Sequence, residues 1–230
     1  MALTIDLWKK PKNVTIIEGF PGFGLVGPIT TEFLIEHMKT EQVGQFLYDD
    51  LPATVVIHQG KVVNPMAIHY SKKFNVLIFH TILNVKGFEW QIADALVKVS
   101  EELKAKEIVS IEGVNVVEKN ATIVFGYGEP KFLALGAKEM KESIIMGVSA
   151  ALLLRAKNTK CLFAQASSNL PDSKAAAEII RFLDKYLGLG VDPAPLLKQA
   201  AEFEQKLKSI YQQAQQAGEE VEKKNLSYLG

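Results

Sequence analysis

The 230-residue sequence predicts an α/β fold with a mixed, largely parallel central sheet, and three observations support this. Short apolar runs alternate with helical patterns through residue 188, several of these runs are almost wholly apolar, and two of the helical patterns keep one apolar stripe. Strands covered on both faces form continuous apolar runs, and such alternation is typical of α/β proteins. Eight strands are predicted, at Val14–Glu18, Val43–Tyr48, Thr54–His58, Met66–Tyr70, Val76–Thr81, Ile108–Glu112, Ala121–Phe125 and Cys161–Gln165.

Two amphipathic helices are predicted between and after these strands. Their apolar residues recur in steps of four, three and four, which keeps one helical face toward a core. The stripes are Ile92, Leu96, Val99 and Leu103 in one helix, and Ala176, Ile180, Leu183 and Leu187 in the other. No helical pattern separates the strands between residues 43 and 81, which predicts either a mixed sheet or a separate hairpin.

The C-terminal region predicts one long helix. Asp192 followed by Pro193 is typical of an N-cap and a first helical residue. The helical pattern runs from there to about residue 224, or ~48 Å at 1.5 Å per residue, which exceeds the width of a domain of this size. Its apolar residues form a heptad seam: Leu196, Ala200, Phe203, Leu207, Ile210, Ala214, Ala217 and Val221. We therefore predict an oligomer interface along this seam, and the alternative is a helix docked on its own domain.

The predicted organisation is an α/β core over residues 1–190, an oligomerisation helix over 191–224 and a flexible tail over 225–230. In the tail, Leu226, Tyr228, Leu229 and Gly230 are either a frayed end or an exposed anchor for a partner's pocket.

Composition excludes several classes of function. The 26 basic and 26 acidic residues give no net charge, which argues against a large nucleic-acid footprint and against polybasic membrane attachment. The sequence has neither a membrane-spanning apolar stretch nor the features of a signal peptide, so we expect a soluble cytoplasmic protein. Cys161 is the only cysteine, and its apolar surroundings predict a buried thiol rather than a nucleophile.

A glycine-rich loop follows the first predicted strand. Gly22, Gly24 and Gly27 have the spacing of a dinucleotide-binding fingerprint and precede a helix. Pro28, however, removes an amide from the start of that helix, and the acidic candidates Asp49 and Asp50 come later than the usual ~20 residues. We interpret Gly19, Gly22, Gly24 and Gly27 as a structural turn, and the alternative is an enzyme that binds a nucleotide or nucleoside.

Catalytic and metal-binding patterns are weak in this sequence. The four histidines are scattered and form no metal-binding motif, so no metal is predicted. Glu18 and Glu112 each end an apolar strand before a glycine, where active sites of α/β proteins gather. Asp172 follows Pro171 and has an alternative role as the N-cap or first residue of the helix that runs to Leu187. With no nucleophile elbow and no Walker sequence, we predict no catalytic residue, no cofactor and no enzyme activity.

Four segments in order resemble one family. They are Glu18-Gly-Phe-Pro-Gly-Phe-Gly-Leu-Val-Gly27, Ile145-Met-Gly-Val-Ser-Ala-Ala-Leu-Leu153, Leu170-Pro-Asp-Ser-Lys-Ala-Ala-Ala177 and Tyr186-Leu-Gly-Leu-Gly-Val-Asp192. The chain is similar to the archaeal homologues of the eukaryotic proteasome assembly chaperones over about residues 14–200. This resemblance implies a three-layer α/β/α core related in shape to nucleoside phosphorylases, used as a binding scaffold.

The resemblance also implies a homo-oligomer that binds the proteasome core or its α subunits without ATP, to assist assembly or gate activation. Relatives often end in a hydrophobic–tyrosine–any-residue tail that enters pockets between α subunits. Here Tyr228 is third from last, and Ser227 precedes it.

Overall fold

The computed structural model describes residues 3–48, 54–58, 60–115, 123–166 and 170–198, with isolated positions up to residue 212. The strands within these residues are β1 (Thr4–Leu7), β2 (Thr15–Gly19), β3 (Glu41–Leu47), β4 (Val56–His58), β5 (Lys61–Val63), β6 (Met66–Ser71), β7 (Val76–Thr81), β8 (Glu107–Val114), β9 (Val124–Tyr127), β10 (Lys138–Glu139) and β11 (Thr159–Gln165). The helices are the 3₁₀ turn η1 (Phe23–Leu25), α1 (Val26–His37), α2 (Glu89–Leu103), α3 (Pro130–Ala134), α4 (Gly147–Arg155), α5 (Ser173–Leu187) and α6 (Ala194–Lys198).

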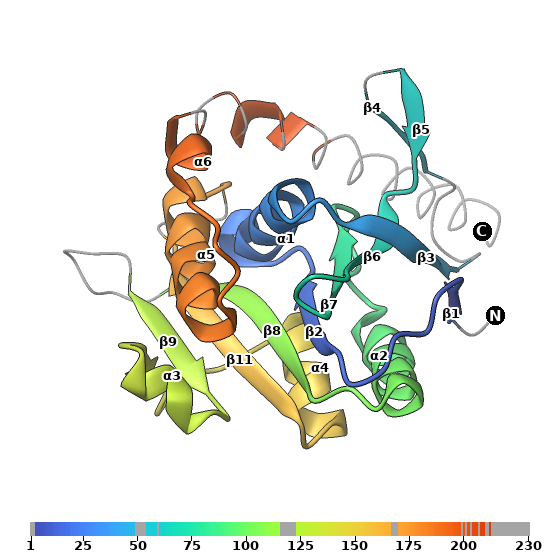
Figure 1. The fold of residues 1–230 in the computed structure, drawn as a ribbon. Coiled ribbons are helices and arrows are strands. Elements are labelled where there is room, and N and C mark those ends of the chain that lie inside the picture. Colours follow the sequence, from blue (N-terminus) through green and yellow to red (C-terminus); the bar gives the residue numbers. More distant parts are fainter. Residues whose placement is uncertain are drawn as a thin grey trace, which may run out of the picture.

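The described elements form three layers, as expected (Figure 1). Helices α1, α5 and α6 cover one face of the sheet, and α2 and α4 cover the other. Both predicted stripes face the core: Ile92 and Leu96 of α2 are fully buried under one face, and Ile180 and Leu183 of α5 under the other. The α/β/α architecture is therefore confirmed. None of the described helices is long and apolar enough to cross a membrane.

The main sheet is mixed, with strand order β1-β3-β6-β7-β2-β8-β11-β9-β10. Its centre, β7-β2-β8-β11, is parallel, whereas β1, β3 and β6 on one side and β9 on the other pair antiparallel. Strands β4 and β5 form a separate hairpin. Both possibilities raised by the helix-free middle of the chain are thus present.

Three strands were not expected from the sequence: β1, β5 and β10. Each has only two to four residues and lacks a long apolar run. β1 and β10 are the two edge strands of the main sheet, and β5 pairs only within the hairpin. Because edge strands are selected by the neighbour they pair with more than by their own propensity, the sequence pattern could not identify them.

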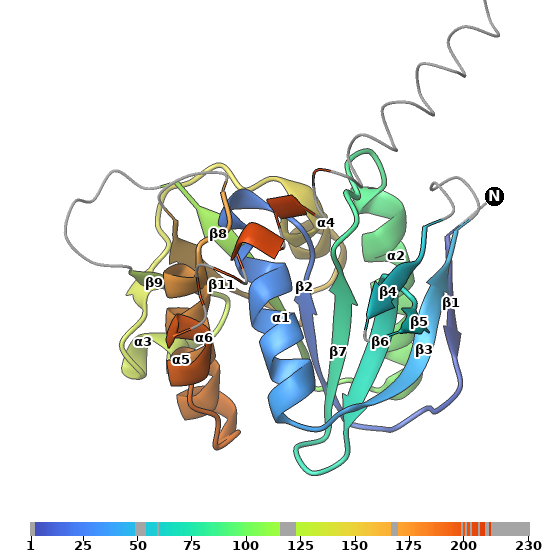
Figure 2. The same ribbon diagram turned by 90° about the horizontal axis from the view of Figure 1, so that it is seen from above.

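The parallel centre gives the sheet two distinct edges (Figure 2). At the amino edge, β2, β7, β8 and β11 begin, and the turn between β6 and β7 and the C-terminal ends of α1 and α5 lie at this same edge. At the carboxyl edge these strands end and α1, α4 and α5 begin. In α/β proteins, ligand sites gather at the carboxyl edge.

A buried ionic cluster joins β2, β8, β11 and α5 near the amino edge. Lys160 Nζ lies 2.8 Å from Glu107 Oε2 and also contacts Glu129. Tyr186 donates its hydroxyl proton to Glu107 Oε2 at 2.7 Å, and Thr15 donates to Glu107 Oε1 at 3.1 Å. Burial alone would lower the pKa of Lys160, but its hydrogen bonds to the two carboxylates raise that pKa overall. The cluster therefore keeps the half-buried Lys160 charged.

The C-terminal region is described only at its beginning. The Ala194 amide donates to Asp192 Oδ1 at 2.9 Å, so Asp192 caps α6 as predicted. Leu196 is buried in the core cluster that also contains residues of α1 and α5, and Ala200 is helical and half-buried. The other seam residues (Phe203, Leu207, Ile210, Ala214, Ala217 and Val221) and the tail residues 226–230 lie outside the described residues. The long helix, its seam and the tail therefore stay predictions.

Candidate functional site

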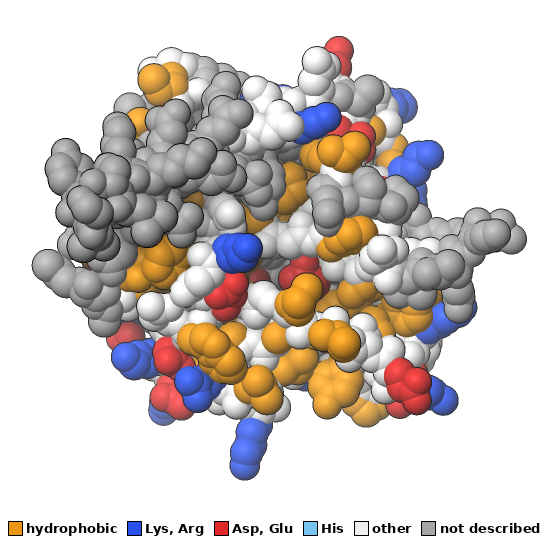
Figure 3. Space-filling view, turned by 180° about the vertical axis from the view of Figure 1, so that it is seen from behind, with side chains coloured by type: hydrophobic (Ala, Val, Ile, Leu, Met, Phe, Trp, Pro, Cys, Tyr) orange, Lys and Arg blue, Asp and Glu red, His pale blue; other side chains and the backbone are white. Residues whose placement is uncertain are grey.

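Two strand-end glutamates come together at the carboxyl edge. Glu18 of β2 is 1% exposed, and its register partner on β8 is Ser110. Glu112 lies two residues further along β8 and is half-buried, while Ser149 reaches the same place from the first turn of α4. Figure 3 looks onto this edge and shows hydrophobic side chains gathered beside a few acidic ones.

The four side chains form one hydrogen-bonded chain. Ser110 Oγ contacts Glu18 Oε1, Ser110 Oγ and Ser149 Oγ are 2.7 Å apart, and Ser149 Oγ lies 3.4 Å from Glu112 Oε2. Each serine has one hydroxyl proton, so three links need a third proton. A proton on either glutamate supplies it, whereas two ionised glutamates would leave one link without a donor. The geometry therefore favours a network in which one of the two carboxyls, that of Glu18 or that of Glu112, is protonated.

The pKa values of both glutamates agree with this geometry. Burial raises the pKa of Glu18 to about 7, against the opposing hydrogen bonds from Ser110 and the Phe20 amide. Burial, followed by the nearby Glu18, raises the pKa of Glu112 to about 8. Two carboxyls that share one buried place favour neutral forms because neither charge is well solvated.

The glycine-rich loop is anchored on these carboxyls. The Phe20 amide donates to Glu18 Oε2 at 3.3 Å, and the Phe23 amide donates to Glu112 Oε1 at 3.2 Å. A Cβ atom at Gly22 would lie 1.6 Å from Glu112 Oε1, so only glycine allows the carboxyl to sit against the loop. The loop amides at Phe20 and Phe23 thus bind the protein's own side chains.

The other predicted loop glycines are also tightly placed. Gly19 and Gly27 touch where β2 meets α1, because a Cβ at Gly19 would lie 2.5 Å from the Gly27 carbonyl oxygen. Gly24 adopts φ 65°, a left-handed conformation that favours glycine. Its carbonyl accepts a hydrogen bond from the Asp172 amide at 2.9 Å. Asp172 itself caps α5 by accepting from the Ala175 amide at 2.9 Å.

The histidines are placed by neighbouring polar groups. His80 Nδ1 lies 2.8 Å from Thr31 Oγ1, and His80 Nε2 lies 3.1 Å from Glu32 Oε2. His69 contacts Thr40 Oγ1 at 3.2 Å, and burial, with a smaller effect of His80, lowers the pKa of His69 to about 4. Across the part of the chain that the structure describes, no three His, Cys, Asp or Glu residues are arranged to hold a metal ion.

Cys161 is buried in β11, as predicted. Burial, together with the nearby Glu18, raises the pKa of its thiol. A thiol held in the neutral form is a poor nucleophile, so the residue fits a packing role.

The site is therefore a closed polar network under a loop. Two loop amides, those of Phe20 and Phe23, already bind carboxyl oxygens, and an ionised carboxylate beside them repels phosphate. Beside this site, Ile144, Met146 and Leu170 are 89%, 76% and 53% exposed. An apolar surface around a closed network is better suited to contacting another protein than to binding a nucleotide.

Sequence reasoning identified Glu18 and Glu112 separately but missed Ser110 and Ser149. One signal was available for Ser110, because it is a polar residue within the apolar run Ile108–Ile111. The structure shows that its side chain is fully buried. Nothing in the sequence indicated that Ser149, in the next helix, completes the network.

We expect the stability of the protein to depend on the protonation of this network. Because the folded-state pKa of Glu112 lies above its ordinary value, the folded protein binds this proton more tightly than the unfolded chain. The stability that this proton contributes is therefore fully present below about pH 4.5, the ordinary value, and is lost as pH rises through about 8. Glu112→Gln keeps the shape and removes the titration of this residue, so at pH 9 it should be more stable than the wild type, by at most the ~5 kcal/mol that a pKa shift from 4.5 to about 8 represents.

The measurement is urea unfolding of both proteins at pH 5, 7 and 9. Glu142→Gln, an exposed position near α4, is the matched control and should follow the wild type at every pH. Parallel pH profiles for Glu112→Gln and the wild type would contradict the proton-sharing network.

Comparison with known proteins matches most of the chain. A family model described as "PAC2 family" matches residues 16–211. Among curated proteins, an uncharacterized protein of Methanocaldococcus jannaschii is 26% identical over 213 residues, which is 88% of this chain and 87% of that protein.

Solved structures give the same result. PbaA of Pyrococcus furiosus, described as an archaeal homolog of proteasome-assembly chaperone, has a TM-score of 0.85 at 27% identity and covers 94% of this chain and 99% of its own. PbaB of the same organism, described as an archaeal proteasome activator, has a TM-score of 0.74 at 22% identity over 91% of this chain and 98% of its own. At that lower identity the likeness shows the fold alone.

Proposed function

This chain belongs to the PAC2 family, and from that premise we propose that it is a proteasome-directed chaperone or adaptor. It binds the core particle or its α subunits, without ATP and without catalysis, to assist assembly or gate activation. The observation that carries this proposal is the full-length similarity to PbaA, described as a homolog of proteasome-assembly chaperone, at a TM-score of 0.85. A protein with this role would act in the cytoplasm, beside the proteasome.

The closed carboxyl edge supports a binding scaffold. In an enzyme of this architecture, the carboxyl edge holds substrate in a crevice lined by loop amides. Here Glu112 fills the space over Gly22 and takes the Phe23 amide, and Pro28 has no amide to offer. The fold therefore keeps the shape associated with ligand binding while its own side chains occupy the loop.

One alternative is an enzyme that binds a nucleotide or nucleoside through residues 19–28. The observation in its favour is that the buried Glu18 and the half-buried Glu112 lie together with raised pKa values, because such groups are common in active sites. The scaffold proposal expects no specific binding of NAD, NADP, ATP or nucleosides in calorimetry. Micromolar affinity for any of them would favour the enzyme.

Self-association and the tail belong to the same proposal. The heptad seam supports an oligomer, and because Leu196 is buried in its own core, the intermolecular part of the seam would begin after it. Leu226, Tyr228 and the terminal carboxylate of Gly230 have the chemistry of an anchor, an aromatic group plus a charge-assisted contact. Several tails on one oligomer would reinforce one another on a ring of subunits.

The test is capture of archaeal 20S core particles and of isolated α subunits by the full chain and by a chain lacking residues 226–230. We expect the full chain to bind and the truncated chain to lose roughly thirtyfold in affinity, which corresponds to ~2 kcal/mol for one buried aromatic anchor. Melting temperature and oligomer mass should not change, because residues beyond a helix end have few internal contacts.

Two outcomes would contradict parts of this proposal. Full affinity of the truncated chain would remove the tail from the binding site and leave the globular surface as the contact. Absence of binding by the full chain to both core particles and α subunits would overturn the proposed function itself.

A further inference from the structure

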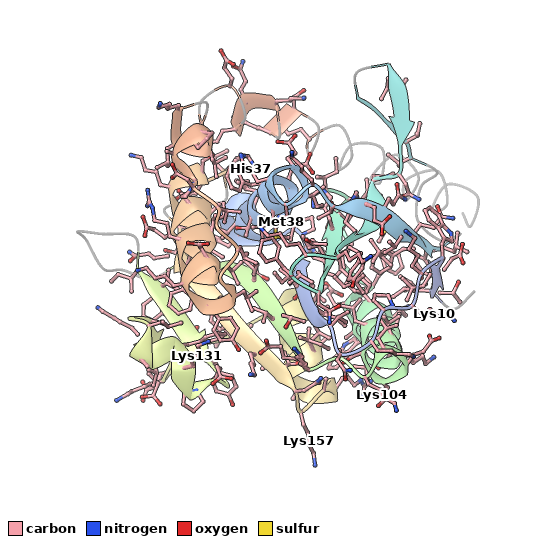
Figure 4. The ribbon with its side chains drawn as sticks, viewed as in Figure 1. Lys10, His37, Met38, Lys104, Lys131 and Lys157 are labelled. Carbon is pink, nitrogen blue, oxygen red and sulfur yellow. The ribbon has the colours of Figure 1, made fainter. Side chains whose placement is uncertain are left out.

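Lysines are concentrated in the loops of the amino edge. Five loops lead into strands that start there, namely residues 8–14 before β2, 38–40 before β3, 72–75 before β7, 104–106 before β8 and 156–158 before β11. Together they hold nine lysines and neither Asp nor Glu. These nine exposed residues, the lysine face, are Lys9, Lys10, Lys12, Lys39, Lys72, Lys73, Lys104, Lys106 and Lys157. Figure 4 shows Lys10, Lys104 and Lys157 on three of these loops, with Lys157 projecting away from the fold.

The loops of the carboxyl edge have no such excess of lysine. Within their described residues, the loops that leave the same five strands hold one lysine, Lys86, and one aspartate, Asp172. Helix dipoles explain part of the difference, because lysine is favourable just after the C-terminus of α1, α2 or α4. The lysines at positions 9, 10, 12, 72 and 73 instead follow strands β1 and β6, so helix ends do not account for them.

Most of this positive charge is not neutralised locally. Lys9 pairs with Glu41, and Lys10 pairs with Glu102 at 2.6 Å, while Lys12 donates to the Glu102 carbonyl. The remaining lysines of the face form no ion pair with any described residue: Lys39, Lys72, Lys73, Lys104, Lys106 and Lys157. A face of this kind attracts anions over a Debye length.

A cavity lies within this face. It has a volume of about 420 Å³ and opens between the last turns of α2 and α4. Lys104, Arg155 and Lys157 line it with one acid, Glu101, and the polar side chains of Ser100 and Asn158. Arg155 Nε is paired with Asp94 at 3.0 Å, so Lys104 and Lys157 are the cations left for a ligand. Asn158 donates to Ser100 Oγ at 3.3 Å, which holds the polar wall in place.

We propose that the lysine face is a docking surface for an acidic protein segment, with one carboxylate seated in the cavity between Lys104 and Lys157. Ammonium groups suit carboxylates that approach from many directions, whereas phosphate recognition favours the arginine fork, and these loops contain no arginine. The zero net charge of the chain also argues for a protein partner over nucleic acid. Given the proposed function, on which this inference rests, the segment belongs to a proteasome subunit. Its contact with the lysine face is separate from the contact made by the C-terminal tail.

The test compares three proteins. Lys104→Glu with Lys157→Glu reverses the cavity charges, and Lys86→Glu with Lys174→Glu makes the same change in charge at exposed positions of the carboxyl edge. The full chains are titrated with fluorescent poly-L-glutamate and with polyuridylate, at low and physiological ionic strength, and are also bound to α subunits. Lys104→Gln with Lys157→Gln repeats the test if charge reversal lowers the melting temperature.

We expect the wild type to bind polyglutamate in a salt-sensitive manner. The cavity variant should lose about tenfold in affinity for polyglutamate and for α subunits, and the control should stay within about twofold. Equal losses in both variants, or no binding of polyglutamate by the wild type, would overturn the proposal. Tighter binding of polyuridylate, lost in the cavity variant, would overturn it in favour of nucleic acid. If polyglutamate binds as expected but neither the wild type nor any variant binds α subunits, the proposed function fails while the site for an acidic segment remains.

Discussion

Replacing Gly113 with alanine should destabilise the protein by about 3 kcal/mol and lower its melting temperature by roughly 6–12 °C. A Cβ atom at Gly113 would lie 1.9 Å from the Phe23 carbonyl oxygen, 2.9 Å from the Phe23 carbonyl carbon and 3.0 Å from Val26 Cγ2. Two of these three contacts are backbone atoms, so no side chain can rotate to make room. The glycine-rich loop must separate from β8, and with it the Phe23 hydrogen bond to Glu112 is lost.

A substitution at a second glycine serves as a control, because it separates the effect of a close contact from the effect of backbone strain. Gly188 ends α5 with φ 67° and has no atom within 4 Å of an added Cβ. Gly188→Ala should therefore lose only about 1 kcal/mol, from the left-handed conformation. Thermal and urea unfolding of the two variants measure the difference. A Gly113→Ala protein that melts like Gly188→Ala would show that the loop can move away from β8 easily.

The second large effect is expected at Lys160. Lys160→Met should destabilise the protein by roughly 3–5 kcal/mol, because Glu107 would remain as a buried carboxylate without its cation. Glu107 is 7% exposed, and its remaining partners, Tyr186 and Thr15, supply hydrogen bonds but no charge. Urea unfolding at neutral pH measures the loss.

Two controls test this explanation. Adding Glu107→Gln to Lys160→Met removes the unpaired charge and should recover much of the lost stability, which a double-mutant cycle would report as coupling. Lys10→Met breaks the exposed pair with Glu102, whose side chains are 55% and 45% exposed, and should change stability by less than about 1 kcal/mol. If Lys160→Met and Lys10→Met are equally mild, the buried cluster contributes little to the fold.

The net charge of the sequence does not reveal how the charged residues are distributed over the surface. The equal numbers of acidic and basic residues give no net charge, but they say nothing about where the charges lie. The nine lysines of the lysine face come from five loops that are far apart in the chain. Only the shared direction of β2, β3, β7, β8 and β11 within the sheet brings these loops to one edge.

The sequence by itself determined the layers, the central strands and the two amphipathic helices of this protein. Burial imposes a local rule on each of these elements, since a strand covered on both faces must be apolar throughout and a packed helix must repeat its apolar residues. The caps at Asp172 and Asp192 are local in the same way, because each side chain binds an amide two or three residues later.

Only the tertiary structure decided the edge strands and the site. The hydrogen-bonded chain from Glu18 through Ser110 and Ser149 to Glu112 joins residues from β2, β8 and α4, and no periodicity links them. Likewise, the glycine spacing predicts a turn, but the Glu112 carboxyl that fills it comes from a strand 90 residues after Gly22. Local sequence encodes which faces are buried, whereas the pairing of strands and the meeting of distant polar groups depend on contacts that exist only once the chain has folded.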